Sequence, residues 1–565
     1  MKKRTAFAFL ALVFIIVMAA AGCSERQTDP IITFESDGGS AVAEREKTAS
    51  VFPVATKEGF RIEGWYEDKY YKKRATFPYT ATKDTTLYAK WTDVEKGSDG
   101  IEYERTEDGK AFVAVSYRDP SYSVCVPDEH LGLPVVKIAS GFMKNRSYVG
   151  LFLIGKNVAQ IDEEFYRCVS LTRFEVRGVN ENYAVENDAL VDVSDKEERI
   201  ICAYPRGLRT EEYTVNIKVG KDAFLYNSSI KNLTLGENAS AEEGAFKEMT
   251  VLESFTVNES NGYFSAKDGI LYSKDFTVLY NYPANKKGTE AVIPDSVITV
   301  EDGAFENSKV SVITLGKGVE NYEDYSSVPY LTEFKVKSGN PFYKAEEGLI
   351  YGADGKTLYR VPQALEGEAR VKEGAETISN FAFYETGKIT SVFLPKSVKT
   401  VCDFAFYYCT EMTNLRFEEE SEVEEIRGGA FVKCDKLKEM TVTSRVPPKT
   451  GDEGIDCGEF ASGFKIIIPD NAKEAYEYFW DFGVKYFDAT GRGVTTYTVT
   501  FDSNGGSDAG SFHGLLVREP EEPTKEGMIF TGWYDNKDCF GEKIEFPFVT
   551  QGHATLYACW ELLIE

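Results

Sequence analysis

One short motif recurs through the middle of this 565-residue chain and constrains its fold more than any other feature. Between residues 138 and 445 the dipeptide Ala-Phe, or a close variant, returns with aliphatic residues around it, as at Phe246, Phe305 and Phe406. Neighbouring copies place their phenylalanines 22 to 25 residues apart. A period in the low twenties corresponds to one coil of a solenoid, so the sequence predicts a stack of coils.

The aliphatic residues of one coil are too few to be buried within that coil. Successive coils must therefore stack their phenylalanines and aliphatic side chains into a continuous column. Three cysteines occupy one equivalent position, three residues after a phenylalanine: Cys168, Cys409 and Cys434. We interpret them as small apolar residues of this column rather than as reactive groups.

A longer repeat lies over the short one. Residues 261–272 are echoed at residues 340–351 and, more weakly, at residues 182–191. Each echo is followed by a second short strand and a proline, at Pro205, Pro283 and Pro362. We interpret the long repeat as a β-hairpin inserted between coils, which adds edge strands and exposed tyrosines to the wall of the solenoid.

The coil pattern Ala-Phe-x-x-Cys-x-x-Leu-x-x-Leu is clearest at Ala430 and Phe431, followed by Cys434, Leu437 and Met440. It resembles the BspA-type leucine-rich repeat of bacterial surface proteins. The resemblance implies a leucine-rich-repeat solenoid, and it implies a role in adhesion to extracellular partners.

Residues 393–398 match the Leu-Pro-x-Ser-Val turn of the same family. We expect repeats over residues 138–465. Residues 101–137 have the alternation of a hairpin that caps the first coil, and residues 466–490 resemble the closing cap of this family. Both caps would protect the open ends of the stack from aggregation.

A second module occurs once at each end of the chain, at residues 31–92 and 497–561. Both copies carry Gly-Trp-Tyr and Leu-Tyr-Ala-x-Trp in the same order. The pair resembles the internalin B-type B-repeat (Listeria-Bacteroides repeat), which implies a small β-grasp-like module. A domain of about 60 residues needs large side chains to build a core. We therefore expect core positions, rather than an exposed recognition platform, for Trp65, Trp91, Trp533 and Trp560.

Together these features predict a β-rich α+β fold, in which a leucine-rich-repeat solenoid with inserted β-hairpins is flanked by two small β-grasp-like modules. The ten cysteines show no C-x-x-C spacing, so neither a zinc site nor a dense disulfide framework is predicted. Cys539 and Cys559 occur only in the second module and are candidates for a local disulfide.

The N-terminus has a basic start, an apolar run too short to span a membrane, and the sequence Ala-Ala-Gly before Cys23. This order resembles a bacterial lipobox, although Ala20 stands where that motif more often has leucine. We expect residues 1–22 to be a signal peptide, Cys23 to carry the lipid, and residues 23–30 to form a lipidated tether. The alternative is an ordinary signal peptide that leaves Cys23 as a thiol. Both predict export, and the first predicts a lipid anchor at the cell surface.

Composition excludes one class of partner. The chain has 91 acidic and 64 basic residues, and removal of the basic leader makes the mature chain more acidic still. Such a surface repels phosphate groups, so we exclude nucleic acid as a partner.

No catalytic, cofactor or metal residues are predicted. The three histidines, His130, His513 and His553, fall in different contexts and are expected at surface or loop positions. Residues 352–357 have the tail of a phosphate loop but lack its first glycine, so we interpret them as a turn. The chain is therefore not predicted to be an enzyme.

The sequence favours a surface protein that binds an extracellular protein or glycan through its solenoid and is held at the membrane by its N-terminal lipid. An alternative is a polysaccharide-capture or carbohydrate-processing lipoprotein, in which Tyr70-Tyr71 and Tyr407-Tyr408 stack on sugar rings. A third is an envelope spacer without a ligand.

Overall fold

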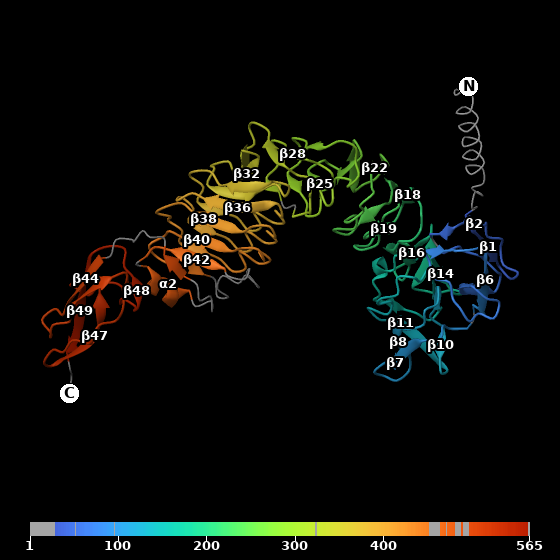
Figure 1. Cartoon of the computed structure of the whole chain (residues 1–565), viewed down its shortest axis with the longest axis horizontal. Coiled ribbons are helices and arrows are strands. Elements are labelled where there is room, and N and C mark those ends of the chain that lie inside the picture. Colours follow the sequence, from blue (N-terminus) through green and yellow to red (C-terminus); the bar gives the residue numbers. More distant parts are fainter. Residues whose placement is uncertain are drawn as a thin grey trace, which may run out of the picture. The chain divides into compact units, whose positions relative to one another are not determined.

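The computed structural model describes residues 29–562 apart from residues 51, 95, 323–324, 451–463, 471, 481–486 and 490–496 (Figure 1). The described residues fall into two compact units. The first holds the residues up to 211 with 217–229 and 241–245, and the second holds 212–216, 230–240 and the chain from 246 onward. Strands dominate both units, so the predicted β-rich fold is confirmed. The described helices are a single 3₁₀ turn, η1 (Phe165–Arg167), and α2 (Lys473–Phe479).

The N-terminal module is a four-stranded sheet with the order β2-β1-β6-β4. Its first strand, β1 (Ile31–Glu35), and its last, β6 (Thr85–Asp93), are parallel neighbours, and β4 (Phe60–Tyr66) pairs with β6 in the antiparallel sense. Three short strands complete the module: β2 (Arg45–Glu46), β3 (Thr48–Ala49) and β5 (Tyr79–Thr80).

The C-terminal module repeats this topology in the order β45-β44-β49-β47. Here β44 (Tyr497–Asp502) and β49 (Ala554–Leu562) are the parallel pair. The other strands are β45 (Ser511–Gly514), β46 (Leu516–Val517), β47 (Met528–Tyr534) and β48 (Phe548–Val549). The prediction of one module present twice is confirmed.

The tryptophans of the two modules occupy two kinds of position. Trp65 and Trp533 are fully buried, as predicted. Trp91 and Trp560 are half-buried against the same cores, and each indole N–H donates to a backbone carbonyl, at 2.8 and 2.9 Å. Trp91 and Trp560 therefore each cover the edge of a module core, and the indole N–H of each has a hydrogen-bond acceptor.

Each coil of the solenoid contributes one longer strand to a main sheet and one short strand to a narrower sheet, with the Ala-Phe turn after the short strand. In the first unit the main strands are β9 (Ser123–Cys125), β12 (Leu151–Ile154) and β14 (Arg173–Val176). In the second unit they are β18 (Glu212–Val215), β20 (Asn232–Leu235), β22 (Ser254–Val257), β26 (Glu290–Val292), β28 (Val312–Leu315), β30 (Glu333–Val336), β34 (Gly367–Arg370), β36 (Ile389–Leu394), β38 (Asn414–Phe417), β40 (Glu439–Thr441), β42 (Lys465–Ile468) and β43 (Phe487–Ala489).

The narrower sheets combine two-residue strands with the longer strands of the inserted hairpins. The two-residue strands are β19 (Lys218–Val219), β21 (Ser240–Ala241), β27 (Thr299–Val300), β29 (Asn321–Tyr322), β35 (Thr377–Ile378), β37 (Thr400–Val401), β39 (Glu425–Ile426) and β41 (Lys449–Thr450). Figure 1 shows the stacked strands of β32 to β42 in yellow and orange.

Before the first coil, β7 (Ile101–Arg105) and β8 (Phe112–Tyr117) form an antiparallel hairpin, and β8 pairs in parallel with β11 (Leu133–Ile138). Two short strands, β10 (Glu129–His130) and β13 (Gln160–Ile161), also pair with β11. The β7–β8 hairpin lies within residues 101–137, the segment that the sequence predicts to be the N-terminal cap.

The predicted column of phenylalanines runs through the coils. Phe406 lies between Phe383 and Phe431, with ring centroids 4.6 and 5.3 Å apart. Cys409 and Cys434 are buried beside them, and their thiols donate to the carbonyls of Phe383 and Phe406 at 3.3 and 3.1 Å. The interpretation of these cysteines as parts of the packed interior is confirmed.

The inserted hairpins are confirmed at all three predicted places. They pair β15 (Tyr183–Glu186) with β16 (Ala189–Asp192), β23 (Phe264–Lys267) with β24 (Ile270–Ser273), and β31 (Tyr343–Glu346) with β32 (Leu349–Gly352). A third strand follows each: β17 (Ile200–Ala203), β25 (Val278–Asn281) and β33 (Thr357–Arg360). The expectation of exposed tyrosines holds for Tyr263, but Tyr272 and Tyr351 are buried because they occupy inward positions of the hairpin.

One asparagine starts each hairpin. The Asn261 amide donates to the carbonyls of Gly236 and Ala239 at 2.7 and 2.8 Å, and its oxygen accepts from the backbone N–H groups of Tyr263 and Phe264. Asn180 and Asn340 make the same four bonds in their own coils. The weakest of the three long repeats therefore begins at Asn180, two residues before residue 182, where the sequence predicts its start.

After the last coils, α2 packs its buried face on the end of the stack. Tyr476 is fully buried and its hydroxyl donates to the carbonyl of Ser444 at 3.1 Å. The indole N–H of Trp480 donates to the carbonyl of Pro448 at 2.8 Å. These contacts lie in the segment predicted to be the C-terminal cap, part of which is outside the described residues.

Candidate functional site

The main sheet of the second unit presents a regular outer face over β34 to β42. Along each strand alternate side chains point inward, so Val392, Leu415 and Met440 are buried while their neighbours face solvent. The parallel register aligns the outward positions into two rows. One row is Glu368, Ser391, Asn414, Glu439 and Lys465, and the other is Arg370, Phe393, Arg416, Thr441 and Ile467.

The second row combines charge with an accessible aromatic ring. The guanidinium of Arg370 lies 5.0 Å from the ring centroid of Phe393, which is half-buried, and Arg416 is exposed on the next strand. Neighbouring strands of a sheet lie about 4.8 Å apart, so successive side chains of one row are close neighbours. The sheet therefore presents a flat surface of mixed charge with an aromatic centre, a composition suited to contacts with another macromolecule.

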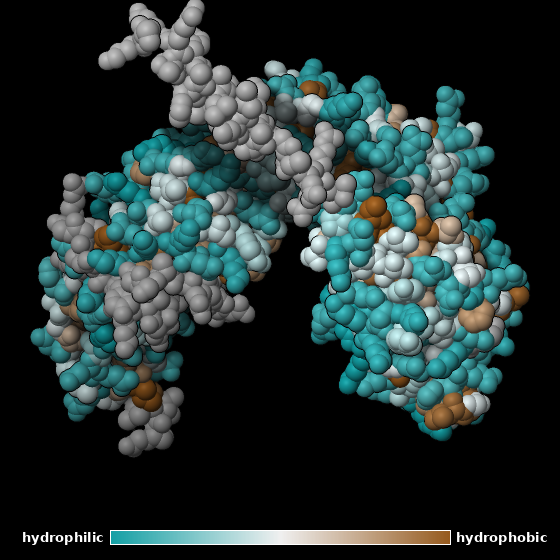
Figure 2. All heavy atoms as spheres, turned by 45° about the vertical axis from the view of Figure 1, so that its right-hand side comes forward, coloured by the Kyte–Doolittle hydropathy of each residue, from teal (hydrophilic) through white to brown (hydrophobic). Residues whose placement is uncertain are grey.

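The visible face of the molecule is mostly polar, with apolar residues in small separate groups (Figure 2). Scattered apolar residues of this kind are normal on a protein surface. This view therefore shows no single broad apolar patch.

Aromatic side chains gather on the Ala-Phe turns of the second unit. Phe381 and Phe404 stack at 5.4 Å, Tyr384 and Tyr407 stack at 5.9 Å, and both pairs are within 7° of parallel. Tyr408 meets Tyr407 edge-on at 4.8 Å. Sugar stacking needs an open ring face, whereas Tyr407 is packed against both Tyr384 and Tyr408; Tyr408 itself is 39% exposed. The geometry favours a packing role for Tyr407 over the sugar platform considered from the sequence.

Of the other tyrosines considered for sugar stacking, Tyr70 is 69% exposed. The ammonium groups of Lys69 and Lys72 lie 5.3 and 6.0 Å from its ring centroid. Tyr71 instead packs edge-on against Tyr66 at 5.4 Å. The Tyr70-Tyr71 pair thus offers a single open ring.

The structure brings two histidines together that the sequence places in separate contexts. His553 Nδ1 accepts a hydrogen bond from the backbone N–H of Thr498 at 3.0 Å, and His513 Nδ1 lies 3.1 Å from the Thr498 hydroxyl. Both side chains are exposed, as the expectation of surface positions states. His130 stacks on Tyr103 at 3.9 Å in the first unit.

Within the part of the chain that the structure describes, no group of three or more His, Cys, Asp or Glu side chains is placed to hold a metal ion. No described helix is long and apolar enough to cross a membrane. Residues 352–357 form the predicted turn, in which the Gly355 N–H donates to the Gly352 carbonyl at 2.8 Å. Cys23, the predicted lipidation site, lies outside the described residues.

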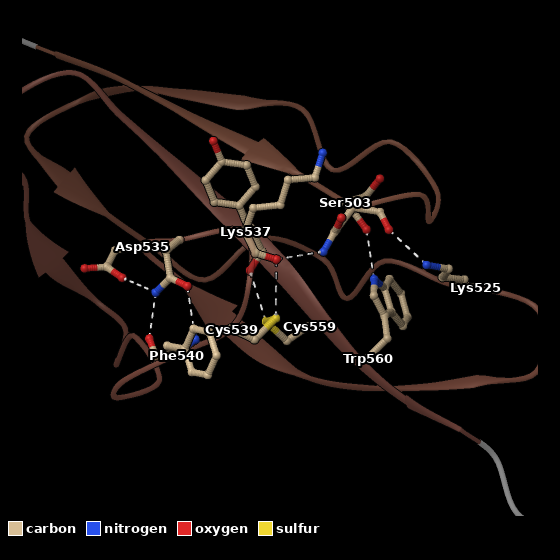
Figure 3. Close-up of a disulfide and its surroundings, with 11 residues drawn as sticks. Ser503, Lys525, Asp535, Lys537, Cys539, Phe540, Cys559 and Trp560 are labelled. Carbon is tan, nitrogen blue, oxygen red and sulfur yellow. Dashed lines mark hydrogen bonds between the residues drawn. A yellow bond between two sulfur atoms is a disulfide. The ribbon is translucent and has the colours of Figure 1, made fainter.

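Cys539 and Cys559 form a disulfide in the C-terminal module (Figure 3), which confirms the candidate pairing. Their Cα atoms are 5.9 Å apart, and the bridge ties the loop after β47 to β49. Trp560 follows Cys559 and donates to the carbonyl of Ser503 (Figure 3). The bridge thus secures the strand that also carries the half-buried tryptophan.

The N-terminal module is firmly joined to the first coils within the first unit. Arg61 is 4% exposed and donates to the hydroxyl and carbonyl oxygens of Ser123 at 2.9 and 3.3 Å. Tyr122 is buried in the module core, where its ring stacks on Phe52 at 3.5 Å, and its N–H donates to the Glu63 carbonyl at 2.8 Å. No sequence signal pointed to this junction, because its partners are about 60 to 70 residues apart and belong to different repeats.

One buried carboxyl has a strongly shifted acidity. Burial raises the pKa of Glu163 to about 7, although backbone N–H groups of Met143 and Phe142 lower it in part. One carboxyl oxygen of Glu163 has no hydrogen-bond partner among the described residues. The protonated form of Glu163 is therefore favoured in the folded first unit at pH values below about 7.

Stacked parallel coils with inserted hairpins, between small β modules, define a repeat protein of the leucine-rich type. The central coils belong to the BspA type leucine-rich repeat region, which matches residues 210–267, 280–339 and 368–449 in six copies. The flanking modules are Listeria-Bacteroides repeat domains, matched at residues 31–90 and 497–559. Repeats of these two kinds indicate a cell-surface or exported protein.

Curated relatives are similar over short segments. A putative Gly-rich membrane protein of Evansella cellulosilytica is 42% identical over 73 residues, which are 12% of this chain and 8% of the relative. Internalin H of Listeria monocytogenes is 41% identical over 68 residues, or 12% of each chain. The chain thus spans a small part of either relative. A leucine rich cell surface protein from Faecalibacterium prausnitzii A2-165 aligns over 70% of this chain and 94% of its own, with 17% identity and a TM-score of 0.31.

Proposed function

We propose that this chain is a cell-surface adhesion protein that binds an extracellular protein through the outer face of its main sheet and carries out no catalysis. The observation that supports the proposal most directly is the pair of side-chain rows on β34 to β42. A solenoid distributes its contacts over many coils, so affinity accumulates without any single catalytic residue.

A protein partner suits this surface better than a small ligand. The rows combine arginine with an accessible aromatic ring at Phe393, and both residue types are enriched where protein interfaces gain most of their affinity. Charged neighbours such as Glu368 and Lys465 would form the polar rim of the contact.

We propose further that Cys23 carries a lipid that holds the chain at the membrane. The motif before Cys23 supports this step. Metabolic labelling with a fatty-acid analogue tests it, because Cys23→Ser should abolish incorporation of the label. Labelling that persists in this variant would contradict the anchor.

The adhesion proposal is tested by binding of the purified full chain to an array of extracellular matrix proteins and glycans. We expect saturable binding to a protein that weakens at least about tenfold in Arg416→Gln and in Phe393→Ala. Lys388→Gln is the matched control, because it removes an exposed cation of the same coil on the turn before β36. Equal binding by all variants, or binding to no protein on the array, would contradict a role for this face.

A further inference from the structure

A cavity of about 360 Å³ opens where the N-terminal module meets the first coils, within the first unit. The module contributes Ser50, Phe52 and residues 74–78, and the coils contribute Pro120, Tyr122, Tyr148, residues 169–170, Thr172, Gly207 and Arg209. A volume of a few hundred cubic ångströms at the junction of two domains is typical of a pocket for a small molecule or one unit of a polymer.

The charge of this cavity is opposite to that of the chain. Its lining includes Arg74 and Arg209 and no aspartate or glutamate, although acidic residues outnumber basic ones by 91 to 64 in the sequence. Neither arginine forms an ion pair with a carboxylate of the described residues. The cavity is therefore a local cationic site on an acidic protein, which favours an anionic ligand.

Arg74 is held in place before any ligand arrives. Its guanidinium donates to the carbonyl of Glu63 and lies 5.8 Å from the ring centroid of Tyr66. A Cβ at Gly64 would lie 2.7 Å from the Arg74 Nε, so the guanidinium packs directly over this glycine. The charge of Arg74 also lowers the pKa of nearby Asp119, although burial raises that pKa more. A pre-positioned guanidinium loses little side-chain entropy when it binds.

The rest of the lining supplies two further kinds of contact. Phe77 is half-buried and Tyr148 is 36% exposed, so both present aromatic surface to the cavity. Hydroxyl groups come from Ser50, Thr76 and Ser170, whereas the Thr172 hydroxyl is engaged with the Gly150 carbonyl and the Tyr122 hydroxyl. Guanidinium groups bind carboxylates in a bidentate manner, aromatic rings pack against C–H faces, and hydroxyl groups exchange hydrogen bonds with hydroxyl groups.

From this combination we infer that the cavity binds a carboxylated sugar, one uronic acid unit of an acidic polysaccharide. The carboxylate would meet Arg74 and Arg209, the C–H face of the sugar ring would meet the aromatic side chains, and the sugar hydroxyls would meet the serine and threonine hydroxyls. This site is separate from the outer face of the main sheet, and it does not depend on the adhesion proposal.

The inference is tested by calorimetric titration of the full chain with a galacturonic acid trimer. We expect one saturable site whose affinity falls as salt is raised, and no binding of the neutral galactose trimer. Arg209→Gln should weaken binding at least about tenfold, and Arg209→Lys should weaken it less. Lys543→Gln is the matched control, because it removes an exposed cation of the C-terminal module, outside the cavity.

Arg209 is exposed, so its replacement leaves the junction intact, whereas replacement of Arg74 removes its bond to the module. A second variant blocks the cavity by volume: Thr76→Trp should abolish binding without changing the thermal unfolding of the chain. Equal binding of the neutral trimer, or unchanged binding by Arg209→Gln, would overturn the inference. Preferential binding of an acidic peptide or of inorganic phosphate would overturn it too. Main-sheet variants such as Arg416→Gln should leave this titration unchanged, so failure of one proposal is distinguishable from failure of the other.

Discussion

At the scale of single residues, the asparagines that begin the hairpins show how one side chain joins two coils. Asn261 is fully buried and uses its whole amide, donating twice to the preceding coil and accepting twice from its own hairpin. Replacement of such a residue leaves several buried backbone groups unpaired, and each unpaired group costs about 1–3 kcal/mol.

We expect Asn261→Ala to lower the free energy of unfolding by at least about 3 kcal/mol, because the Ala239 carbonyl and the N–H groups of Tyr263 and Phe264 lose their bonds to this side chain. Urea unfolding followed by circular dichroism measures this. Asn321→Ala serves as the control, since Asn321 is exposed on β29 and should change stability by less than about 0.5 kcal/mol. Similar losses in both variants would contradict the assigned role.

Glu163 predicts a pH dependence. Its carboxyl has a folded pKa of about 7, above its ordinary value of 4.5, so between these values the folded state binds more protons than the unfolded state. Stability of the first unit should therefore fall as pH rises from 4.5 to 8, by about 3 kcal/mol. Glu163→Gln should remove this part of the pH dependence in thermal unfolding. A pH profile that is unchanged in the variant would contradict the shifted acidity.

At the scale of elements, the sequence predicted those features that repeat. The Ala-Phe period predicted the column around Phe406, and the long echo predicted the three hairpins, because burial imposes the same residue types on each coil. The junction around Arg61 and Tyr122 has no such periodicity. Its contacts form between positions far apart in the chain, so neither the junction nor the cavity beside it was predictable from the sequence.

The two modules provide an internal comparison for the disulfide. In the C-terminal module Cys559 on β49 lies opposite Gly532 on β47. In the N-terminal module the equivalent position, opposite Gly64, is Lys90, so no cysteine stands there. The bridge closes a sequence separation of 20 residues, which restricts the unfolded chain and stabilises the module by about 3 kcal/mol.

Cys539→Ser combined with Cys559→Ser should therefore lower the unfolding temperature of the C-terminal module and leave the N-terminal module unchanged. Hydrogen exchange of β47 and β49, compared with β4 and β6, measures the two modules separately in one sample. Equal loss of protection in both modules would contradict a local effect.

At the scale of the whole molecule, the division into two compact units has an energetic consequence. Each unit has its own buried clusters, with Phe142 and Phe152 in the first and Phe383 and Phe406 in the second. We therefore expect unfolding of the chain to involve more than one transition, since the stability of a repeat protein depends on contacts between neighbouring coils.

We expect Phe406→Ala to destabilise the second unit by about 3–5 kcal/mol, since it empties the centre of the column. Hydrogen exchange should accelerate across β36 to β40 and stay unchanged across β8 to β14. The control is Phe404→Ala on the same turn, where the side chain is 38% exposed and its loss should have a small effect. Faster exchange in both units would show that they unfold together.

The parallel pairing of the first and last strands of each module has a mechanical consequence. When the two ends of a module are pulled apart, β1 and β6, or β44 and β49, slide in opposite directions along their shared ladder. The load then falls on all the hydrogen bonds between the two strands at once, instead of opening them one after another. A chain stretched by flow between an N-terminal attachment point and a partner bound to its repeats would thus carry a shear clamp, the N-terminal module, within the loaded segment.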